Sequence, residues 1–247
     1  MKFAAIADIH GNCPALEAVL TDIAALSIAE VVNLGDHVSG PLEAARTADL
    51  LIDRGFPSVR GDQDRILVEL WQAGSSARSD FRQLERKHFA WMASMPATLM
   101  YGQEVFLCHG SPRDDADFWL DYVTSDGGVR ASPIDVIEAA AEGINAQVIL
   151  CAHTHIPKVV RLRDGRMVVN PGSIGLPGYD GQMPFSYVVE LGTPHACYAI
   201  LELTRRGWSA TIRYVPYDTT AMAALARSKG MLTWASAIAT GWVERAK

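Results

Sequence analysis

Five short segments of the chain carry histidine and carboxylate side chains whose chemistry suits metal binding. Each segment directly follows an apolar run that is typical of a buried strand. Because sites in open α/β sheets form at the carboxyl ends of strands, we expect the five segments to meet. Mixed histidine and carboxylate ligands favour Mn, Fe, Zn or Ni over Ca or Mg. The segments are Asp8-Ile9-His10, Gly35-Asp36-His37, Gly61-Asp62-Gln63-Asp64, His109-Gly110 and His153-Thr154-His155.

The elements that must position these segments alternate between strand-like and helix-like runs. Pro14 near the start of one helical run and Gly55 at the end of another support the predicted helix limits. Strands separated by helices predict parallel pairing with right-handed crossovers. The expected order is strand, helix, strand, helix, strand over residues 2–8, 13–26, 30–36, 41–55 and 57–60.

After residue 60 the chain continues with alternating helices and strands, and its last strands are expected to be antiparallel. Antiparallel strands are expected up to about residue 217 because apolar and polar residues alternate there. We expect one domain over residues 1–247, with lid-like insertions near 66–100 and 112–131. A helical stretch is expected over 64–95, with a Gly-Ser break near 74–76. The other expected elements are strands at 104–111 and 147–157, a helix at 132–143 and C-terminal helices over 218–247.

Composition narrows the classes of function. The chain has 247 residues, 49% hydrophobic content and a net charge of −6, which disfavours a general nucleic-acid surface. The four scattered cysteines favour a reduced, cytoplasmic protein over a disulfide scaffold. The apolar start is too short for a signal peptide or a membrane span, so no membrane partner is expected.

The order and spacing of the five segments, from Asp8 through His155, resemble the signature of the calcineurin-like metallophosphoesterases. The following NPGSIGLP, residues 170–177, is similar to a loop of the small bacterial phosphodiesterase branch of that superfamily. The resemblance implies a four-layer αββα sandwich of two mixed sheets flanked by helices. It also implies a binuclear metal site and phosphoester hydrolysis.

The resemblance further implies two bound transition-metal ions and the residues that would ligate them. A carboxylate bridge and a bridging hydroxide can hold two cations about 3.5–4 Å apart, and the hydroxide then attacks phosphorus in line. Asp36 is the implied bridge and would therefore take part in catalysis. The first metal would take Asp8, His10 and His155, and the second would take Asp62, His109 and His153.

Asp62 stands where the family usually has asparagine. Three carboxylates and a hydroxide against two divalent ions leave the site about neutral, whereas asparagine would leave about one positive charge. We expect Asp62 to tighten metal binding and to weaken attraction for multiply charged monoesters.

Gln63 stands where many members have a catalytic histidine. Glutamine cannot donate a proton at useful pH, and diesters tolerate that loss better than alkyl monoesters, so a phosphodiesterase is favoured. Two nearby side chains remain candidates for the catalytic machinery. His37 could replace the acid or lie outside the site, and Asp64 could act there or cap the helix that begins near Arg65.

Several residues near these segments are candidates for substrate binding. Arginines suit bidentate phosphate contacts, and the Phe118-Trp119-Leu120 run could form a wall for an apolar or base-bearing leaving group. The tryptophans of the tail, Trp208, Trp234 and Trp242, are expected in the core. The candidate substrate-binding residues are Asn12, Arg60, Gln63, Arg65 and Arg113.

Two other functions remain open. A phosphomonoesterase or nucleotide phosphatase would use the same centre on a small-molecule phosphoester. The same fold is also similar to that of the small retromer subunit, a protein-binding scaffold with a degraded metal site, but here every ligand position still holds a ligand-type residue. The last two helices could form a homodimer face.

Overall fold

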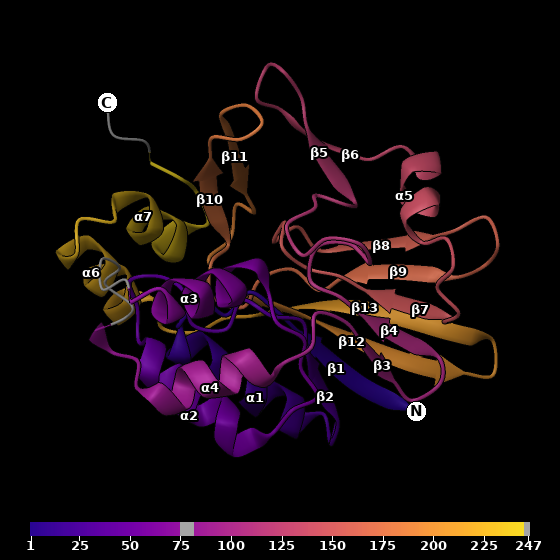
Figure 1. Ribbon diagram of the computed structural model, residues 1–247, viewed down its shortest axis with the longest axis horizontal. Helices are drawn as coiled ribbons and strands as arrows, with labels where there is room; N and C mark the ends of the chain where they lie inside the picture. Colours follow the sequence, from indigo (N-terminus) through magenta and orange to yellow (C-terminus); the bar gives the residue numbers. More distant parts are fainter. Residues whose placement is uncertain (75–81, 245–247) are drawn as a thin grey trace.

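Two mixed β-sheets lie face to face at the centre of the computed structural model, which describes residues 1–74 and 82–244 (Figure 1). In the first sheet the strand order is β13-β12-β1-β2. β1 pairs with β2 in parallel and with β12 in antiparallel fashion. The strands are β1 (Lys2–Ile6), β2 (Val31–Asn33), β12 (Ala196–Thr204) and β13 (Gly207–Val215).

The second sheet has the order β3-β4-β7-β9-β8. Its central strands β4, β7 and β9 are parallel, and its two edge strands are antiparallel to their neighbours. The strands are β3 (Leu99–Tyr101), β4 (Val105–Leu107), β7 (Val148–Leu150), β8 (Lys158–Arg161) and β9 (Met167–Asn170).

Side-chain alternation along the strands builds the layers. Phe3 and Ala5 of β1 point into the core between the sheets, whereas Ala4 and Ile6 point toward α1 (Cys13–Ala25). In β7, Ile149 packs with α5 (Ile134–Ala140) on the far face of the second sheet. Strands buried on both faces read as continuous apolar runs, which is why they were visible in the sequence. The expected four-layer αββα sandwich is confirmed.

Three further helices pack beside α1. α2 (Ala44–Arg54) contacts α1 and α4 (Arg86–Ser94), and α4 contacts α3 (Asp62–Gln72). The predicted helical stretch over 64–95 is therefore two helices. Of the predicted Gly-Ser break, residues 75 and 76 lie outside the described residues.

The predicted third strand at 57–60 is wrong, because only one isolated bridge, between Asn33 and Ser58, forms there. The Val59 amide donates to the Asn33 carbonyl, but the next amide, of Arg60, donates to the Pro96 carbonyl instead. Pro57 has no amide hydrogen to give to a ladder. The chain therefore leaves the sheet edge and turns into α3.

Two hairpins and two helices complete the described fold. The expected loop at 112–131 contains the hairpin β5 (Asp121–Val123) and β6 (Val129–Ala131). β10 (Gly178–Gly181) pairs with β11 (Tyr187–Glu190) and stands between that hairpin and α7 in Figure 1. The C-terminal helices are α6 (Thr220–Ser228) and α7 (Leu232–Thr240). Over residues 1–74 and 82–244, none of the helices has the length and apolar character needed to cross a membrane.

Candidate metal centre

The loops that leave the strands bring seven histidine and aspartate side chains together. They come from the ends of β1, β2, β4 and β7 and from the first turn of α3. In three groups of three, ligand atoms lie within 4.8 Å of one another. The seven are the residues expected from the sequence, namely Asp8, His10, Asp36, Asp62, His109, His153 and His155.

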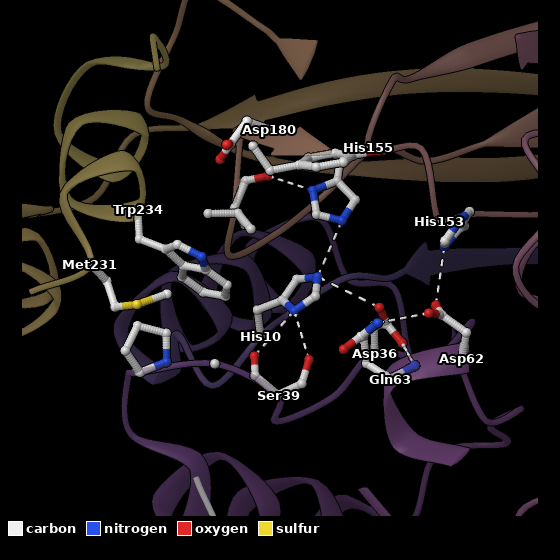
Figure 2. A pocket seen from close by; sticks show the side chains of 14 residues that line it. His10, Asp36, Ser39, Asp62, Gln63, His153, His155, Asp180, Met231 and Trp234 are labelled. Atoms are coloured by element: carbon white, nitrogen blue, oxygen red, sulfur yellow. Dashed lines mark hydrogen bonds and ion pairs between the residues drawn. The ribbon is translucent and has the colours of Figure 1, made fainter. Parts of the chain in front are cut away.

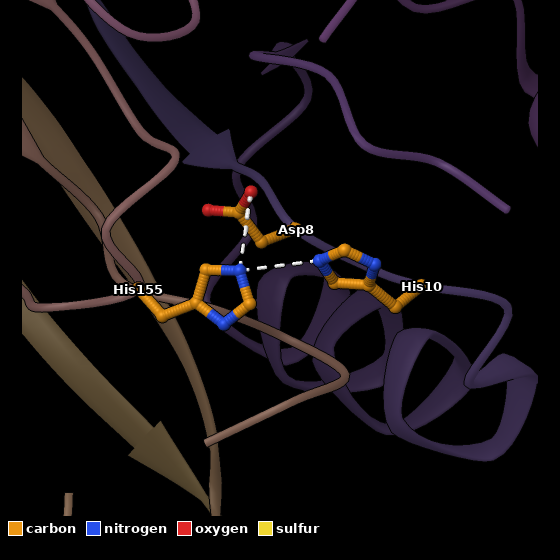
Figure 3. Close-up of side chains that lie close together, drawn as sticks. All are labelled: Asp8, His10 and His155. Atoms are coloured by element: carbon orange, nitrogen blue, oxygen red, sulfur yellow. Dashed lines mark hydrogen bonds and ion pairs between the residues drawn. The ribbon is translucent and has the colours of Figure 1, made fainter. Parts of the chain in front are cut away.

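Asp8, His10 and His155 form the first group (Figure 3). The Nε2 atom of His155 lies 3.6 Å from Oδ1 of Asp8 and 3.1 Å from Nε2 of His10. All three side chains are buried. The group therefore presents two imidazole nitrogens and one carboxylate to a shared point.

Asp62, His109 and His153 form the second group. Oδ1 of Asp62 lies 3.3 Å from Nε2 of His109 and 3.1 Å from Nδ1 of His153. Asp62 thus turns toward the cluster. Burial opposes ionisation, but the nearby His109 and His153 side chains hold the pKa of the Asp62 carboxyl well below its usual value.

Asp36 lies between the two groups. Its Oδ2 is 3.7 Å from Nε2 of His10, and its Oδ1 is 3.4 Å from Nε2 of His109. Each oxygen of one carboxylate therefore faces a different group. This is the arrangement that a carboxylate bridge between two ions requires.

Backbone carbonyls fix the tautomers of three of the histidines. Nδ1 of His10, His109 and His155 donates to the carbonyl oxygens of Ser39, Leu34 and Leu176, over 3.2, 2.7 and 2.7 Å. Each Nε2 is then left with a lone pair directed into the cluster, as in metal-binding histidines. Two lone pairs cannot hydrogen-bond to each other, so the 3.1 Å approach of His10 and His155 suits two ligands of one cation.

Buried polar atoms without hydrogen-bond partners also fit a metal centre. Within the described residues these include both carboxylate oxygens of Asp8 and Nε2 of His109. Burial raises the pKa of Asp8 well above its usual value and lowers that of His155 well below its own. Bound cations would favour the ionised carboxylate, and neutral imidazole is the form that ligates metal. The residues present therefore fit metal ions, and the mixed donor set suits transition metals.

The backbone at this centre adopts a conformation that side-chain-bearing residues seldom take. Asp8, His10, Asp36, His153 and His155 have φ between 51° and 69°. Ser27 is the one further non-glycine residue with positive φ among residues 1–74 and 82–244. Such conformations cost about 1–3 kcal/mol each and cluster at functional sites. The tight turns aim these side chains back over the strand ends.

His37 does not line the cavity, and of the two alternatives left open for it the structure shows the position outside the site. Its side chain is fully buried, its Nδ1 donates to Asp64 over 2.7 Å, and its ring packs against Trp91. Asp64 is fully buried as well and accepts backbone amides of Asp36, His37 and Gly61. Asp64 therefore caps α3, which begins at Asp62 rather than near Arg65, and it holds the Asp36 loop.

Four of the candidate substrate-binding residues do not line the cavity over the centre. Asn12 is buried, donates to the Gly175 carbonyl and Tyr217, and caps α1. Arg60, Arg65 and Arg113 line a separate hollow of about 320 Å³. There Arg65 forms a bidentate pair with Asp115, at 2.8 and 2.9 Å. Asn12, Arg65 and Arg113 are held by partners that spacing along the chain does not reveal.

The cavity over the centre has a volume of about 490 Å³, and Figure 2 shows the side chains around it. Gln63 lines it, and its Nε2 donates to Oδ2 of Asp62 over 2.7 Å. No described residue of the expected lid segments 66–100 and 112–131 lines this cavity. Its outer walls come instead from β10 and from α7 with the turn before it, through Tyr179, Asp180, Met231 and Trp234.

The aromatic residues are distributed differently from the expectation. Trp119 and Leu120 are buried in the core beside α5, so they form no wall for a leaving group. Phe118 alone of that run contacts a ligand candidate, with its ring centroid 5.3 Å from that of His153. Trp208 is in the core, whereas Trp234 faces the cavity and Trp242 is 56% exposed. No local pattern distinguishes these three tryptophans in the sequence.

Comparison with known proteins agrees with this geometry. An uncharacterised protein of Methanocaldococcus jannaschii is 25% identical over 219 residues, which is 75% of this chain and 81% of that protein. A metallophosphoesterase structure from Sphaerobacter thermophilus shares the fold, with 23% identity, a TM-score of 0.74 and coverage of 98% and 100% of the two chains. A hypothetical protein from Pyrococcus horikoshii does so with 18% identity, a TM-score of 0.72 and coverage of 98% and 99%.

The calcineurin-like phosphoesterase superfamily domain matches residues 1–193, which include every residue of the two candidate ligand groups. This superfamily comprises metal-dependent phosphoester hydrolases, in agreement with the cluster of histidine and aspartate ligands. The chain therefore belongs to the calcineurin-like phosphoesterase superfamily.

Proposed function

We propose that the protein is a binuclear metal-dependent phosphodiesterase acting on small-molecule diesters. The two histidine and aspartate groups would each hold one transition-metal ion, and Asp36 would bridge them. When bound, the metals supply a hydroxide nucleophile at neutral pH and neutralise charge on the phosphoryl oxygens. Asp62 and Asp36 line the cavity, so the ions that they would hold could be reached by a phosphoryl group bound there.

The charge of the cavity lining is the observation that favours a diester over a monoester. The described residues around the cavity include no lysine or arginine, and Asp180 adds a carboxylate at its outer wall. A monoester carries up to two negative charges and a diester one. The lining therefore offers little to attract the extra charge of a monoester.

The lack of an acid at position 63 also favours a diester substrate over a monoester. Gln63 contacts Asp62 and cannot donate a proton to a leaving group. His37, the nearest alternative along the chain, is bound to Asp64 away from the cavity. Expulsion of an unactivated alkoxide, as from an alkyl monoester, would therefore proceed without protonation.

The alternative function, a protein-binding scaffold, is less well supported. A scaffold would not need seven converging ligand-type side chains.

The test is hydrolysis of bis(4-nitrophenyl) phosphate beside 4-nitrophenyl phosphate after loading with Mn²⁺. The Asp36→Ala variant is the blank for contaminating activity. We expect kcat/KM for the diester to exceed that for the monoester by about tenfold or more, which corresponds to about 1.4 kcal/mol. A preference for the monoester would overturn the diester assignment. Absence of turnover with Mn²⁺, Fe²⁺, Zn²⁺ and Ni²⁺ would overturn the enzymatic function.

A further inference from the structure

An arc of four rings borders the cavity beside the first ligand group. The ring centroid of Trp234 lies 5.6 Å from that of His10, with the planes 89° apart. His10 lies 5.0 Å from His155, and His155 lies 4.7 Å from Tyr179. The two outer rings come from α7 and β10, far from the ligand loops in sequence. The arc extends the metal centre into an aromatic surface.

Gly40 allows Trp234 to take its place. A Cβ atom at Gly40 would lie 2.3 Å from Cη2 of Trp234, and the φ of Gly40 is +127°. The indole therefore rests directly on the backbone of the loop that follows β2. Figure 2 shows Trp234 and Met231 on one side of the cavity and Gln63, Asp62 and His153 on the other. The space between them adjoins the ligand groups.

The polar character of this space is acidic. Asp180 directly follows Tyr179 and is exposed at the cavity wall, where its carboxylate can only accept hydrogen bonds while ionised. A ligand in this space would present a flat apolar face to the aromatic rings and hydrogen-bond donors to Asp180. It would carry no second phosphate there, since no described lysine or arginine lines the wall.

We propose that this space binds the nucleoside part of a nucleoside phosphodiester, with its base against Trp234 and Tyr179. This assignment rests on the proposed phosphodiesterase function and specifies its substrate class. A nucleobase has the required flat face, and its amine or imide and the sugar hydroxyls are donors that Asp180 accepts. The cavity, at about 490 Å³, lies within the 300–1,000 Å³ range of small-molecule sites. Trp234 is thus a residue that determines specificity.

The test compares two diesters with the same leaving group. Thymidine 5′-(4-nitrophenyl phosphate) carries a nucleoside, and methyl 4-nitrophenyl phosphate carries only a methyl group. We expect the Mn²⁺-loaded protein to prefer the nucleoside diester. Trp234→Ala should lower kcat/KM about tenfold to a hundredfold on that substrate and less than about twofold on the methyl diester, because base stacking on one aromatic ring contributes about 1–3 kcal/mol.

Three further variants keep the test decisive if Trp234→Ala folds poorly. Trp234→Phe should retain most of the preference, because a ring remains. Gly40→Ala should remove it by displacing the indole. Trp242→Ala is the matched control, because Trp242 is a tryptophan of the same C-terminal segment that is 56% exposed and does not line the cavity. It should leave both rates unchanged.

The outcomes separate the two proposals. If neither diester is hydrolysed, the phosphodiesterase function fails. If both are hydrolysed and Trp234→Ala slows them equally, Trp234 acts only by supporting His10, and the nucleoside assignment is overturned.

Adenosine, which has no phosphoester bond to hydrolyse, measures binding in this space separately from catalysis. It should inhibit hydrolysis of the methyl diester competitively in the wild type, and Trp234→Ala should raise its inhibition constant about tenfold or more.

Discussion

The Gln63 side-chain amide donates a hydrogen bond to Oδ2 of Asp62 over 2.7 Å, while Oδ1 of Asp62 faces His109 and His153. The two residues that depart from the family pattern are therefore directly coupled. Gln63 holds one oxygen of Asp62 so that the other is directed at the second ligand group. The exchange of Asn-His for Asp-Gln is one change in the site rather than two.

This coupling predicts the behaviour of a variant that restores the family pattern. Gln63→His combined with Asp62→Asn should raise kcat for an alkyl phosphomonoester about tenfold to a hundredfold, because an imidazole acid becomes available. Each single variant should gain less than the double one, since contacting residues are not additive. Steady-state kinetics of the wild type and the three variants with an alkyl phosphomonoester test this. Gln63→Asn is the control, because it adds no acid. Equal gains from Gln63→His alone and from the double variant would contradict the coupling.

Asp62→Asn alone should weaken metal binding and favour monoesters. Removing one carboxylate leaves the loaded site with about one more positive charge, so ions should dissociate more readily and KM for a monoester should fall. Metal content after dialysis and the monoester KM are the two measurements. If neither changes, the charge of Asp62 does not influence the centre.

Metal binding should depend on Asp36 and should stabilise the fold. The wild type should retain about two metal ions per chain, and metal at a hundred times its dissociation constant should add about 2.7 kcal/mol per bound ion to the free energy of unfolding. Asp36→Ala should lose most of this gain. Elemental analysis and thermal unfolding with and without Mn²⁺ test this. Asp49→Ala, which removes an exposed carboxylate paired with Lys87 and His88, should gain as much stability from Mn²⁺ as the wild type does.

Gly61 should be essential for the position of Asp36. A Cβ atom there would lie 2.0 Å from Oδ1 of Asp36, although the φ of −85° is open to alanine. Gly61→Ala should therefore displace the carboxylate and lower diesterase kcat/KM by about a hundredfold. Gly55→Ala is the comparison, because Gly55 has φ of +62° and no heavy atom within 4 Å of the added Cβ. It should cost about 1 kcal/mol of stability without changing the rate.

Asp22 should contribute stability that depends on pH. The hydrogen bonds from Arg213, at 2.8 Å each, and then that from Tyr198 lower the pKa of the Asp22 carboxyl. A depressed pKa in the folded state stabilises above the unfolded value, and the gain is lost as pH falls through the folded value. Asp22→Asn should therefore cost about 1 kcal/mol at pH 7, a figure reduced for solvent screening.

This difference between the Asp22→Asn variant and the wild type should shrink below about pH 4, near the usual pKa of an aspartate. Urea unfolding at pH 7, 5 and 3 measures it. A difference that stays constant down to pH 3 would show that the ionised carboxylate is not the source. Thr21→Ala, a change at the neighbouring position of α1 whose hydroxyl bonds only within the helix, should show no such pH dependence.

Much of the fold was predictable because its physical signals are local. The strands of the central sheets are buried on both faces, so β1, β2, β4, β7 and β9 appear as short apolar runs. Residues 57–60, Pro-Ser-Val-Arg, are wrongly predicted as a strand, because a short β-prone segment after a helix is also what a third parallel strand would show. Only the diversion of the Arg60 amide to Pro96 distinguishes them.

Local sequence patterns were enough to predict which residues could bind metal and where they would meet. Asp8, Asp36, His109 and the pair at 153 and 155 each follow a strand, and the ends of strands in these sheets gather at one edge. Their position relative to the strands is a local property. Superfamily membership follows from the same segments.

The residues that surround the centre are set by packing between distant parts of the chain. Trp234 faces the cavity because α7 packs against β10 and Gly40 leaves room for the indole. His37 is turned away from the cavity because Asp64 of α3 binds its ring. Asn12, Arg65 and Arg113 looked free along the chain but have partners elsewhere. These outcomes depend on contacts between residues far apart in sequence, and such contacts leave no periodic pattern along the chain.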